Sequence, residues 1–204
     1  MAEGDRPSDA VADALRDVVS AFEQAEIPYV LIGGLASTVH GRPRSTLDID
    51  FLIRQGDAKD ALAALSRAGF STEETNPQWI YKASRDNTDI DLIFWLKGDV
   101  YLDDEMLARA TEREVEGVPV RVIPPEDLIV VKAVIHDEQT PRHWGDALAV
   151  IADTELDWEY LARRARKGVR RVLALLIYAH SNDLVVNEET IRSLFAQVYS
   201  GSAP

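Results

Sequence analysis

The chain has 204 residues, which is enough for one packed core with a small helical extension. Its composition, 46% hydrophobic and 28% charged, excludes disordered and fibrous proteins, and the lack of cysteine excludes disulfides and thiolate metal sites. The net charge of −13 disfavours broad, non-specific binding to nucleic acid, although a local basic patch can override it. Any bound metal must be held by oxygen or histidine, which favours a hard cation.

The two ends of the chain contain no targeting or membrane signal. Residues 1–8 are polar and acidic, and they predict a disordered tail and not a signal peptide. The apolar run VLALLIYA near the C-terminus is far too short to cross a bilayer. We therefore expect a cytoplasmic protein with no membrane partner.

Hydrophobic periodicity and turn residues predict alternating helices and strands. In chain order they are a helix over residues 8–26, a strand over 29–32, a glycine turn with a short helix over 35–40, a strand over 48–53, a helix over 57–69, a hairpin over 79–84 and 89–96, a helix over 103–114, a strand over 118–123 and a helix from residue 124. The pattern beyond residue 141 is helical. We predict an α/β (α+β) fold with a mixed, twisted sheet flanked by helices: a core over residues 9–140 and a helical C-terminal subdomain over 141–204.

Two acidic pairs lie inside predicted strands. Because successive side chains of a strand alternate between its faces, Asp48 and Asp50 share one face of their strand, and Asp89 and Asp91 share one face of theirs. Crowded carboxylates repel unless a cation lies between them. If the two strands are neighbours, three or four carboxylates converge, which suits Mg²⁺ or Mn²⁺ and the chemistry of phosphates.

The glycine pair Gly33-Gly34 lets the backbone approach a ligand closely, and the short helix after it offers amide donors to a polyphosphate. Further donors to the phosphates are expected from Ser37, Arg44, Ser45 and Thr46. Alone, a glycine pair or an Asp-x-Asp is most often a turn or a solvated strand. The combination of both with a further acid on a later strand is what predicts a site.

At these residues the chain resembles the nucleotidyltransferase superfamily that shares its fold with DNA polymerase β. That superfamily has a Gly-Gly or Gly-Ser turn, then Asp-x-Asp, then a third acid on a later strand. In this sequence these are Gly33-Gly34, Asp48-Ile49-Asp50 and Asp91. Asp89 is an alternative third acid. The resemblance implies a Mg²⁺-dependent enzyme that moves a nucleoside monophosphate from an NTP to an acceptor hydroxyl and releases pyrophosphate. Asp48 and Asp50 would bridge two ions, and Asp91 would complete the one nearer the attacking hydroxyl.

The segment over residues 124–151 resembles the bacterial branch that includes AbiEii-type toxins of abortive-infection and toxin–antitoxin systems. In that branch a helical lysine and a later aspartate are functionally important, and they map to Lys132 and Asp146, with Arg142 in the same region. The likeness implies a toxin that acts on tRNA or protein, with an antitoxin as partner. The Gly-Gly turn is also that of small-molecule, antibiotic-type nucleotidyltransferases, so a small-molecule acceptor is the alternative. A non-catalytic nucleotide-binding protein is a second alternative.

Two groups of cations could serve this chemistry. Lys132 is surrounded by apolar residues on its helix, so it is expected near the interior opposite a triphosphate or Asp146, or else extended to water at the helix edge. Six cations between residues 163 and 171 could receive an RNA end, or they could form a solvated face paired with nearby acids.

Overall fold

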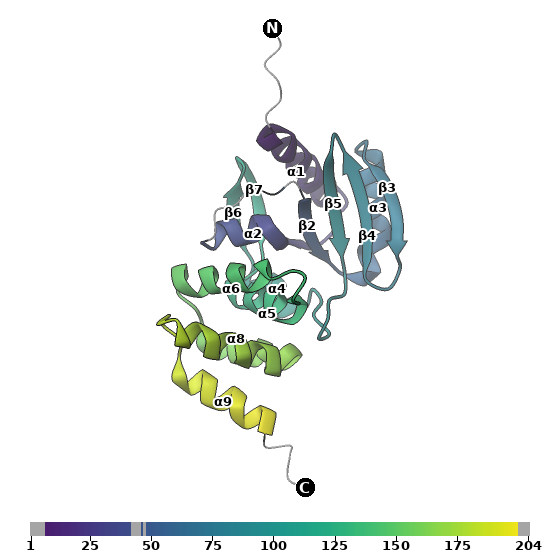
Figure 1. The fold of residues 1–204 in the computed structure, drawn as a ribbon. Coiled ribbons are helices and arrows are strands. Elements are labelled where there is room, and N and C mark those ends of the chain that lie inside the picture. Colours follow the sequence, from purple (N-terminus) through teal and green to yellow (C-terminus); the bar gives the residue numbers. More distant parts are fainter. Residues whose placement is uncertain (1–6, 42–45, 47, 200–204) are drawn as a thin grey trace. The chain divides into compact units, whose positions relative to one another are not determined.

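The computed structural model describes residues 7–41, 46 and 48–199 (Figure 1). Residues 1–6 of the tail predicted over residues 1–8 lie outside the described residues, as do Arg44 and Ser45, whereas residues 7 and 8 belong to the first helix and not to a tail. The helices are α1 (Pro7–Gln24), α2 (Gly33–Val39), α3 (Ala58–Arg67), α4 (Asp104–Arg109), α5 (Pro125–Ile135), α6 (Arg142–Asp153), α7 (Trp158–Arg164), α8 (Val169–Ser181) and α9 (Glu188–Tyr199), with 3-10 turns η1 (Gln55–Asp57) and η2 (Ala165–Gly168). The strands are β1 (Tyr29–Leu31), β2 (Asp48–Ile53), β3 (Ser71–Asn76), β4 (Ile80–Arg85), β5 (Thr88–Ile93), β6 (Thr111–Val115) and β7 (Val118–Val122).

Residue contacts divide the described chain into two compact units. The first holds the sheet and α1 to α4, over residues 7–39, 46, 48–96 and 101–123. The second holds α5 to α9, together with residues 40–41 and 97–100. By its contacts α5 groups with the C-terminal helices, whereas the sequence-based division placed residues 125–135 in the core.

The described strands form one mixed, seven-stranded sheet in the order β3-β4-β5-β2-β1-β7-β6. β1 pairs antiparallel with β2 and parallel with β7, and β2 pairs parallel with β5. The outer pairs are antiparallel. The mixed α/β fold expected from the sequence is therefore confirmed.

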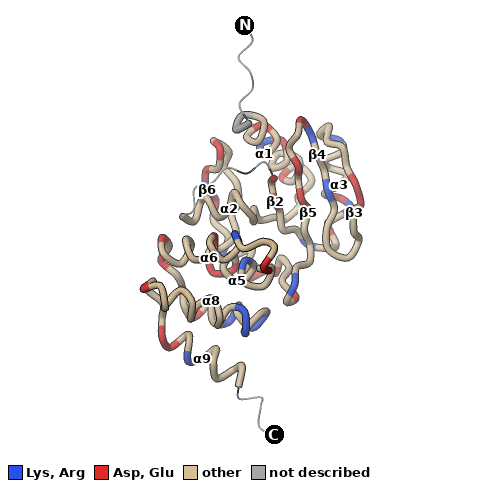
Figure 2. The backbone as a smooth tube through the Cα atoms, viewed as in Figure 1, with Lys and Arg blue, Asp and Glu red and all other residues tan. Residues whose placement is uncertain are grey.

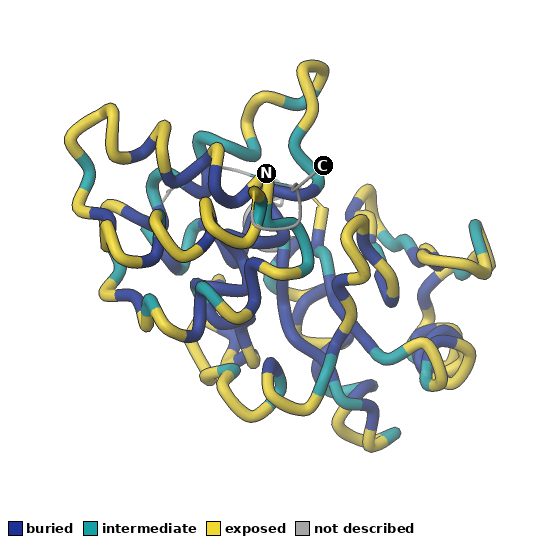
Figure 3. Tube along the Cα trace, turned by 90° about the horizontal axis from the view of Figure 1, so that it is seen from below, coloured by how far each residue is buried: buried dark blue, intermediate teal, exposed yellow. Residues whose placement is uncertain are grey.

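One face of the sheet is covered by α1 and α3 (Figure 1). Phe22 of α1 lies 5.4 Å from Phe51 of β2 and 5.5 Å from Tyr29 of β1, measured between ring centroids. Buried positions run along the strands and along the inner sides of the helices (Figure 3). The alternation of β2 therefore sends Phe51 into this core and its two aspartates to the opposite face.

The helix predicted over residues 103–114 is wrong in its second half. α4 ends at Arg109, and Thr111–Val115 forms β6, which pairs with β7. The residues between the two strands, Glu116 and Gly117, have φ values of 49° and 73°, as in a tight two-residue hairpin turn. Pairing with β7 overrides the helical preference of this charged segment.

In the second unit α5 is buried around its whole circumference, and α6, α7 and α8 pack against it. α9 packs on α7 and α8. Beyond residue 141 the described elements are helical, as the sequence predicts. Among the described helices none is both long and apolar enough to cross a lipid bilayer.

Candidate functional site

The two acidic pairs lie side by side because β2 and β5 are neighbouring parallel strands. Their register places Asp48 opposite Asp89 and Asp50 opposite Asp91. In parallel strands, residues in register point to the same face, so all four carboxylates lie on the side opposite α1. Acidic positions on β2 and β5 are visible in Figure 2. The sequence predicts that the carboxylates converge if the two strands are neighbours, and β2 and β5 are neighbours.

Residues in register across β2, β5 and β4 form three rows on this face. The rows are Leu52, Ile93 and Ile80; then Asp50, Asp91 and Lys82; then Asp48, Asp89 and Ser84. The first row is buried, the acids of the second are half-buried, and those of the third are exposed. Asp50 and Asp91 therefore sit at the edge of an apolar layer, where a charge interacts more strongly than in open water.

Lys82 is a cation on this face, and it is not among the site residues that the sequence predicts. Its Nζ lies 2.7 Å from Oδ1 of Asp91. The hydrogen bond to Asp91 raises the pKa of Lys82, the charges of Asp91, Asp89 and Asp48 raise it further, and burial opposes them. The signal that could have found it is the turn Asp86-Asn87, with φ values of 51° and 62°, because a two-residue turn fixes the pairing of Lys82 with Asp91.

Gly33 lies directly against Asp50. Its φ is 70°, and a Cβ added to it would lie 1.8 Å from Oδ2 of Asp50. The amide of Ile32 also donates to the carbonyl oxygen of Asp50 at 2.8 Å. Only glycine provides both the left-handed backbone and the room for this carboxylate. The predicted glycine turn and the predicted acid are thus one local structure.

The side chain of Ser37 is fully buried and donates to the carbonyl oxygen of Gly33 at 2.8 Å. This hydrogen bond stabilises the glycine turn at the start of α2, in which Gly34 is also buried. Oγ1 of Thr46 lies 3.4 Å from the backbone nitrogen of Asp48, at the entrance to β2. Phosphate binding by these residues remains a prediction.

Among the described residues no three His, Asp or Glu side chains form a ready-made metal site. In this arrangement Asp91 is held by an ammonium group. The donor set nevertheless fits a hard cation: Asp48, Asp50 and Asp91 offer only oxygen, from one face of two adjacent strands.

In the second unit Lys132 forms an ion pair with Asp146, with 2.8 Å between Nζ and Oδ2. Both side chains are buried, at 2% and 0% exposure. The sequence left open whether Lys132 faces an anion in the interior or extends to water. In the structure it faces Asp146 and does not extend to water. A role for this pair with a nucleotide remains a prediction.

His143 lies in the electrostatic environment of this pair. Burial, helped by the positive charges of Lys132 and Arg142 and opposed by Asp146, lowers the pKa of His143 to about 4. His143 is therefore neutral near pH 7 and does not compete with Lys132 for the charge of Asp146.

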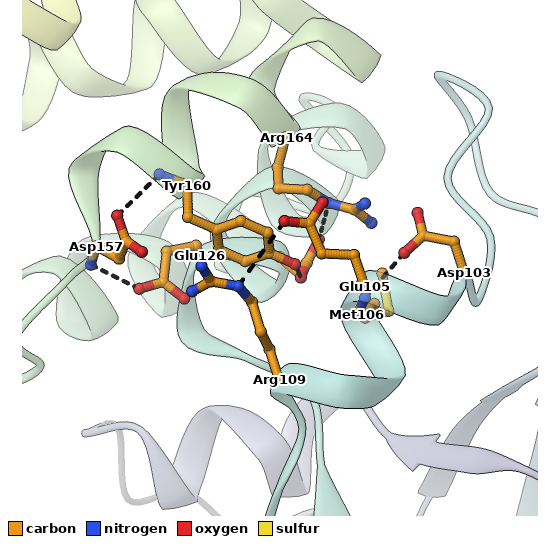
Figure 4. A network of polar contacts seen from close by, with 9 residues as sticks. Asp103, Glu105, Met106, Arg109, Glu126, Asp157, Tyr160 and Arg164 are labelled. Atoms are coloured by element: carbon orange, nitrogen blue, oxygen red, sulfur yellow. Dashed lines mark hydrogen bonds and ion pairs between the residues drawn. The ribbon is translucent and has the colours of Figure 1, made fainter.

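The basic segment over residues 163–171 is only partly a solvated face. Arg164 is buried, and its Nε donates to Oδ1 of Asp127 at 2.5 Å. The hydroxyl of Tyr160 donates to the other oxygen of Asp127. The side chain of Asp157 accepts from the backbone nitrogen of Tyr160 and so caps α7, and the backbone nitrogen of Asp157 donates to the side chain of Glu126 (Figure 4). Arg164 is thus part of the packing of α5 against α7.

Other cations of the segment lie at the surface. Arg166, Arg170 and Arg171 are exposed, and Arg171 donates to the carbonyl oxygen of His136. Arg163 stacks on the ring of Tyr160, with 5.4 Å to the centroid. The sequence offered Glu155, Asp157 and Glu159 as partners of this segment, and the structure shows that Asp127 of α5 is the partner of the Nε of Arg164.

A family model described as "Uncharacterised nucleotidyltransferase" matches residues 6–184. A comparison with curated proteins finds no significant match. Similar solved structures include the antibiotic-resistance factor ANT(2'')-Ia, at 19% identity over 84% of this chain and 97% of that chain, with a TM-score of 0.58. The lincosamide antibiotic adenylyltransferase LnuA is 15% identical over 70% of this chain and 97% of that chain, with a TM-score of 0.51. An antigenic nucleotidyltransferase-like protein from Paracoccidioides brasiliensis is 14% identical over 92% and 93%, with a TM-score of 0.53. The nucleotidyltransferase fold expected from the sequence is confirmed.

We predict that Gly33→Ala displaces Asp50. The added methyl group overlaps the carboxylate and the residue must keep a left-handed backbone, so the free energy of unfolding should fall by about 3 kcal/mol. Gly117→Ala is the matched control: its φ is 73°, and its added Cβ meets nothing within 4 Å. It should cost only about 1 kcal/mol. Urea unfolding measures both, and equal losses would show that Gly33 and Asp50 are not in contact.

A second prediction concerns the buried pair of the second unit. Lys132→Met should lower the free energy of unfolding by about 3–5 kcal/mol, because it leaves the charge of Asp146 buried without its ammonium partner. The double variant with Asp146→Leu should recover most of that loss. Thermal unfolding of the two single variants and the double variant measures the coupling, and purely additive losses would contradict it.

Proposed function

The chain belongs to the family described as "Uncharacterised nucleotidyltransferase", and from that premise we propose that it moves a nucleoside monophosphate from an NTP to an acceptor hydroxyl. The observation that supports this is the register of β2 and β5, which pairs Asp50 with Asp91, together with the close approach of Gly33 to Asp50. Family membership favours an enzyme over a non-catalytic binding protein, and the three expected carboxylates are present.

In the proposed reaction the acceptor oxygen forms a bond to the α-phosphorus, and the bond from that phosphorus to the pyrophosphate oxygen breaks. The hydroxyl proton leaves to solvent or to a nearby carboxylate. Gly33 and Gly34 let the backbone come close to the phosphates, and Ser37 keeps their turn in place. Positioning of the two reactants supplies most of the acceleration.

Asp48, Asp50 and Asp91 would hold the divalent cation, Mg²⁺ or Mn²⁺. When bound, the cation supplies positive charge to the phosphate oxygens as negative charge develops on them. Asp50 and Asp91 are the stronger candidates for this work, since their side chains are half-buried, whereas Asp48 and Asp89, the other pair in register, are exposed. For Lys132 and Asp146, a role with the nucleotide rests on the resemblance to the toxin branch alone.

The acceptor we propose first is the hydroxyl of a small molecule. Two structures similar to this chain are antibiotic-modifying or antibiotic-resistance proteins, and one of them is an adenylyltransferase. Among the described residues the carboxylate face carries four acids and one lysine, a charge balance that favours cationic over polyanionic acceptors. A small cationic acceptor is consistent with both.

A toxin that adds a nucleotide to tRNA or to a protein is the second candidate. The exposed cations Arg166, Arg170 and Arg171 favour an RNA acceptor. An antitoxin partner belongs to this candidate alone. If neutralising those three arginines abolished modification of tRNA, the result would support the RNA acceptor over the small-molecule acceptor.

We expect Asp50→Asn to lower nucleotidyl transfer at least about 10³-fold, because the carboxylate charge beside the phosphates is lost without a change of shape. Asp91→Asn should be far more damaging than Asp89→Asn, since Asp91 is half-buried and lies opposite half-buried Asp50, whereas Asp89 and its partner Asp48 are exposed. Pyrophosphate release with Mg²⁺ and each NTP measures the rates, and circular dichroism checks the fold. Near wild-type activity of Asp50→Asn would refute the assignment, and a larger effect at Asp89 would move the third acid there.

The acceptor is found by labelling. Each α-labelled NTP is incubated with Mg²⁺ and, separately, with an aminoglycoside and lincosamide panel, total RNA, the protein itself and cell extract. Asp50→Asn is the negative control. Label on a small molecule supports the first candidate, and label on RNA or protein supports the second.

A further inference from the structure

The carboxylate face contains a cation that the proposed chemistry does not use. Lys82 reaches Asp91 from β4, whereas the arginines at the ends of the same strands pair elsewhere. Arg54, after β2, pairs with Asp104, and Arg85 of β4 pairs with Asp17 of α1. Of these three cations only Lys82 pairs with an acid of the carboxylate face. Lys82 and Arg85 lie on opposite faces of β4, as the alternation of a strand requires.

The ammonium of Lys82 contacts one of the two carboxylate oxygens of Asp91, a side chain that would hold the metal ion. Nζ lies 2.7 Å from Oδ1 of Asp91, which is the separation of a direct, charge-assisted hydrogen bond. A divalent cation at the same carboxylate would repel the ammonium, because both are positive and both would lie within a few ångströms of each other. Binding of the divalent cation therefore favours movement of the ammonium away from Asp91, and the ammonium in turn weakens binding of the cation.

The exposure of the pair makes this exchange possible. The side chain of Lys82 is 46% exposed and that of Asp91 is 20% exposed. Exposed ion pairs are weak, and the four-carbon stem of lysine allows its head to move into solvent without unfolding the strand. The pair can therefore open locally, while the register of β4 and β5 stays unchanged.

We propose that Lys82 is an internal counter-ion that holds Asp91 in the resting enzyme and competes with the divalent cation for it. The inference rests on the proposed function, since it assumes that Asp91 is a metal ligand. In this role Lys82 is a positioning residue. It keeps Asp91 aligned with Asp50 in the absence of a ligand, and it makes the bare cation bind weakly. An NTP brings a triphosphate to the same face, and that anion offers Lys82 a new partner, so that cation and nucleotide bind together.

The test is Mn²⁺ binding without nucleotide, followed by the electron paramagnetic resonance signal of free Mn²⁺. Lys82→Met should bind Mn²⁺ about tenfold more tightly than wild type, the order expected when one screened unit charge beside the site is removed. Lys82→Arg keeps the charge and should stay within about twofold of wild type. Lys59→Met is the matched control, because Lys59 is exposed on α3 with Glu74 as its partner, and it should change nothing.

The same titration tests whether the effect passes through Asp91. In an Asp91→Asn background the further change Lys82→Met should give much less than its tenfold gain, because the carboxylate for which both cations compete is gone. Without metal, Lys82→Met should also melt at a lower temperature than wild type, and Mn²⁺ should raise its melting temperature more than it raises that of wild type.

The possible failures are distinguishable. If wild type binds Mn²⁺ and Lys82→Met binds it equally or more weakly, the inference about Lys82 is overturned and the proposed function stands. If neither protein binds Mn²⁺, with or without NTP, both are overturned. A tenfold gain that is as large in the Asp91→Asn background would mean that Lys82 does not act through Asp91.

Discussion

The parallel pairing of β2 with β5 is the constraint on which the rest of the site depends. It places two acids of one strand in register with two acids of the other, so that like charges are held side by side by backbone hydrogen bonds. The strands can be held in this way because their opposite faces pack, through Phe51 and its neighbours, against Phe22 of α1. The stability of the core thus offsets the repulsion of the carboxylates, and a positive charge at this face would relieve that repulsion.

Several features of this site are local and follow from the sequence. The alternation of β2 separates its aspartates from its core residues, and the glycine pair provides the left-handed turn that leaves room for Asp50. The hairpin of β4 and β5 is also local, since the two residues of its turn fix which side chains face each other. The position of the turn therefore predicts that Lys82 faces Asp91, whereas the periodicity of apolar residues alone does not predict this pairing.

Other features depend on contacts between distant segments, and no pattern within a segment predicts them. The choice of β5 as the parallel neighbour of β2 is made by the whole sheet, so Asp89 and Asp91 could be placed on a common face but not assigned partners. β6 was taken for helix because its charged residues have no strand-like alternation, and it becomes a strand through pairing with β7. Likewise, burial on all sides predicted that Lys132 needs an anion, but only the packing of α6 on α5 shows that Asp146 provides it.

The two lysines show how burial decides what an ion pair can do. Lys132 and Lys82 each hold an aspartate at nearly the same distance, 2.8 Å and 2.7 Å. The first pair is shielded from water, so separating it would leave two desolvated charges, and it acts as a fixed part of the helical unit. The second pair is half in solvent, so water can replace either partner and separation costs little. A charged side chain that moves as ligands bind and dissociate must belong to a partly exposed pair such as Lys82 and Asp91. The proposed movable cation is therefore the lysine on the open face of the sheet, and not the one in the interior of α5.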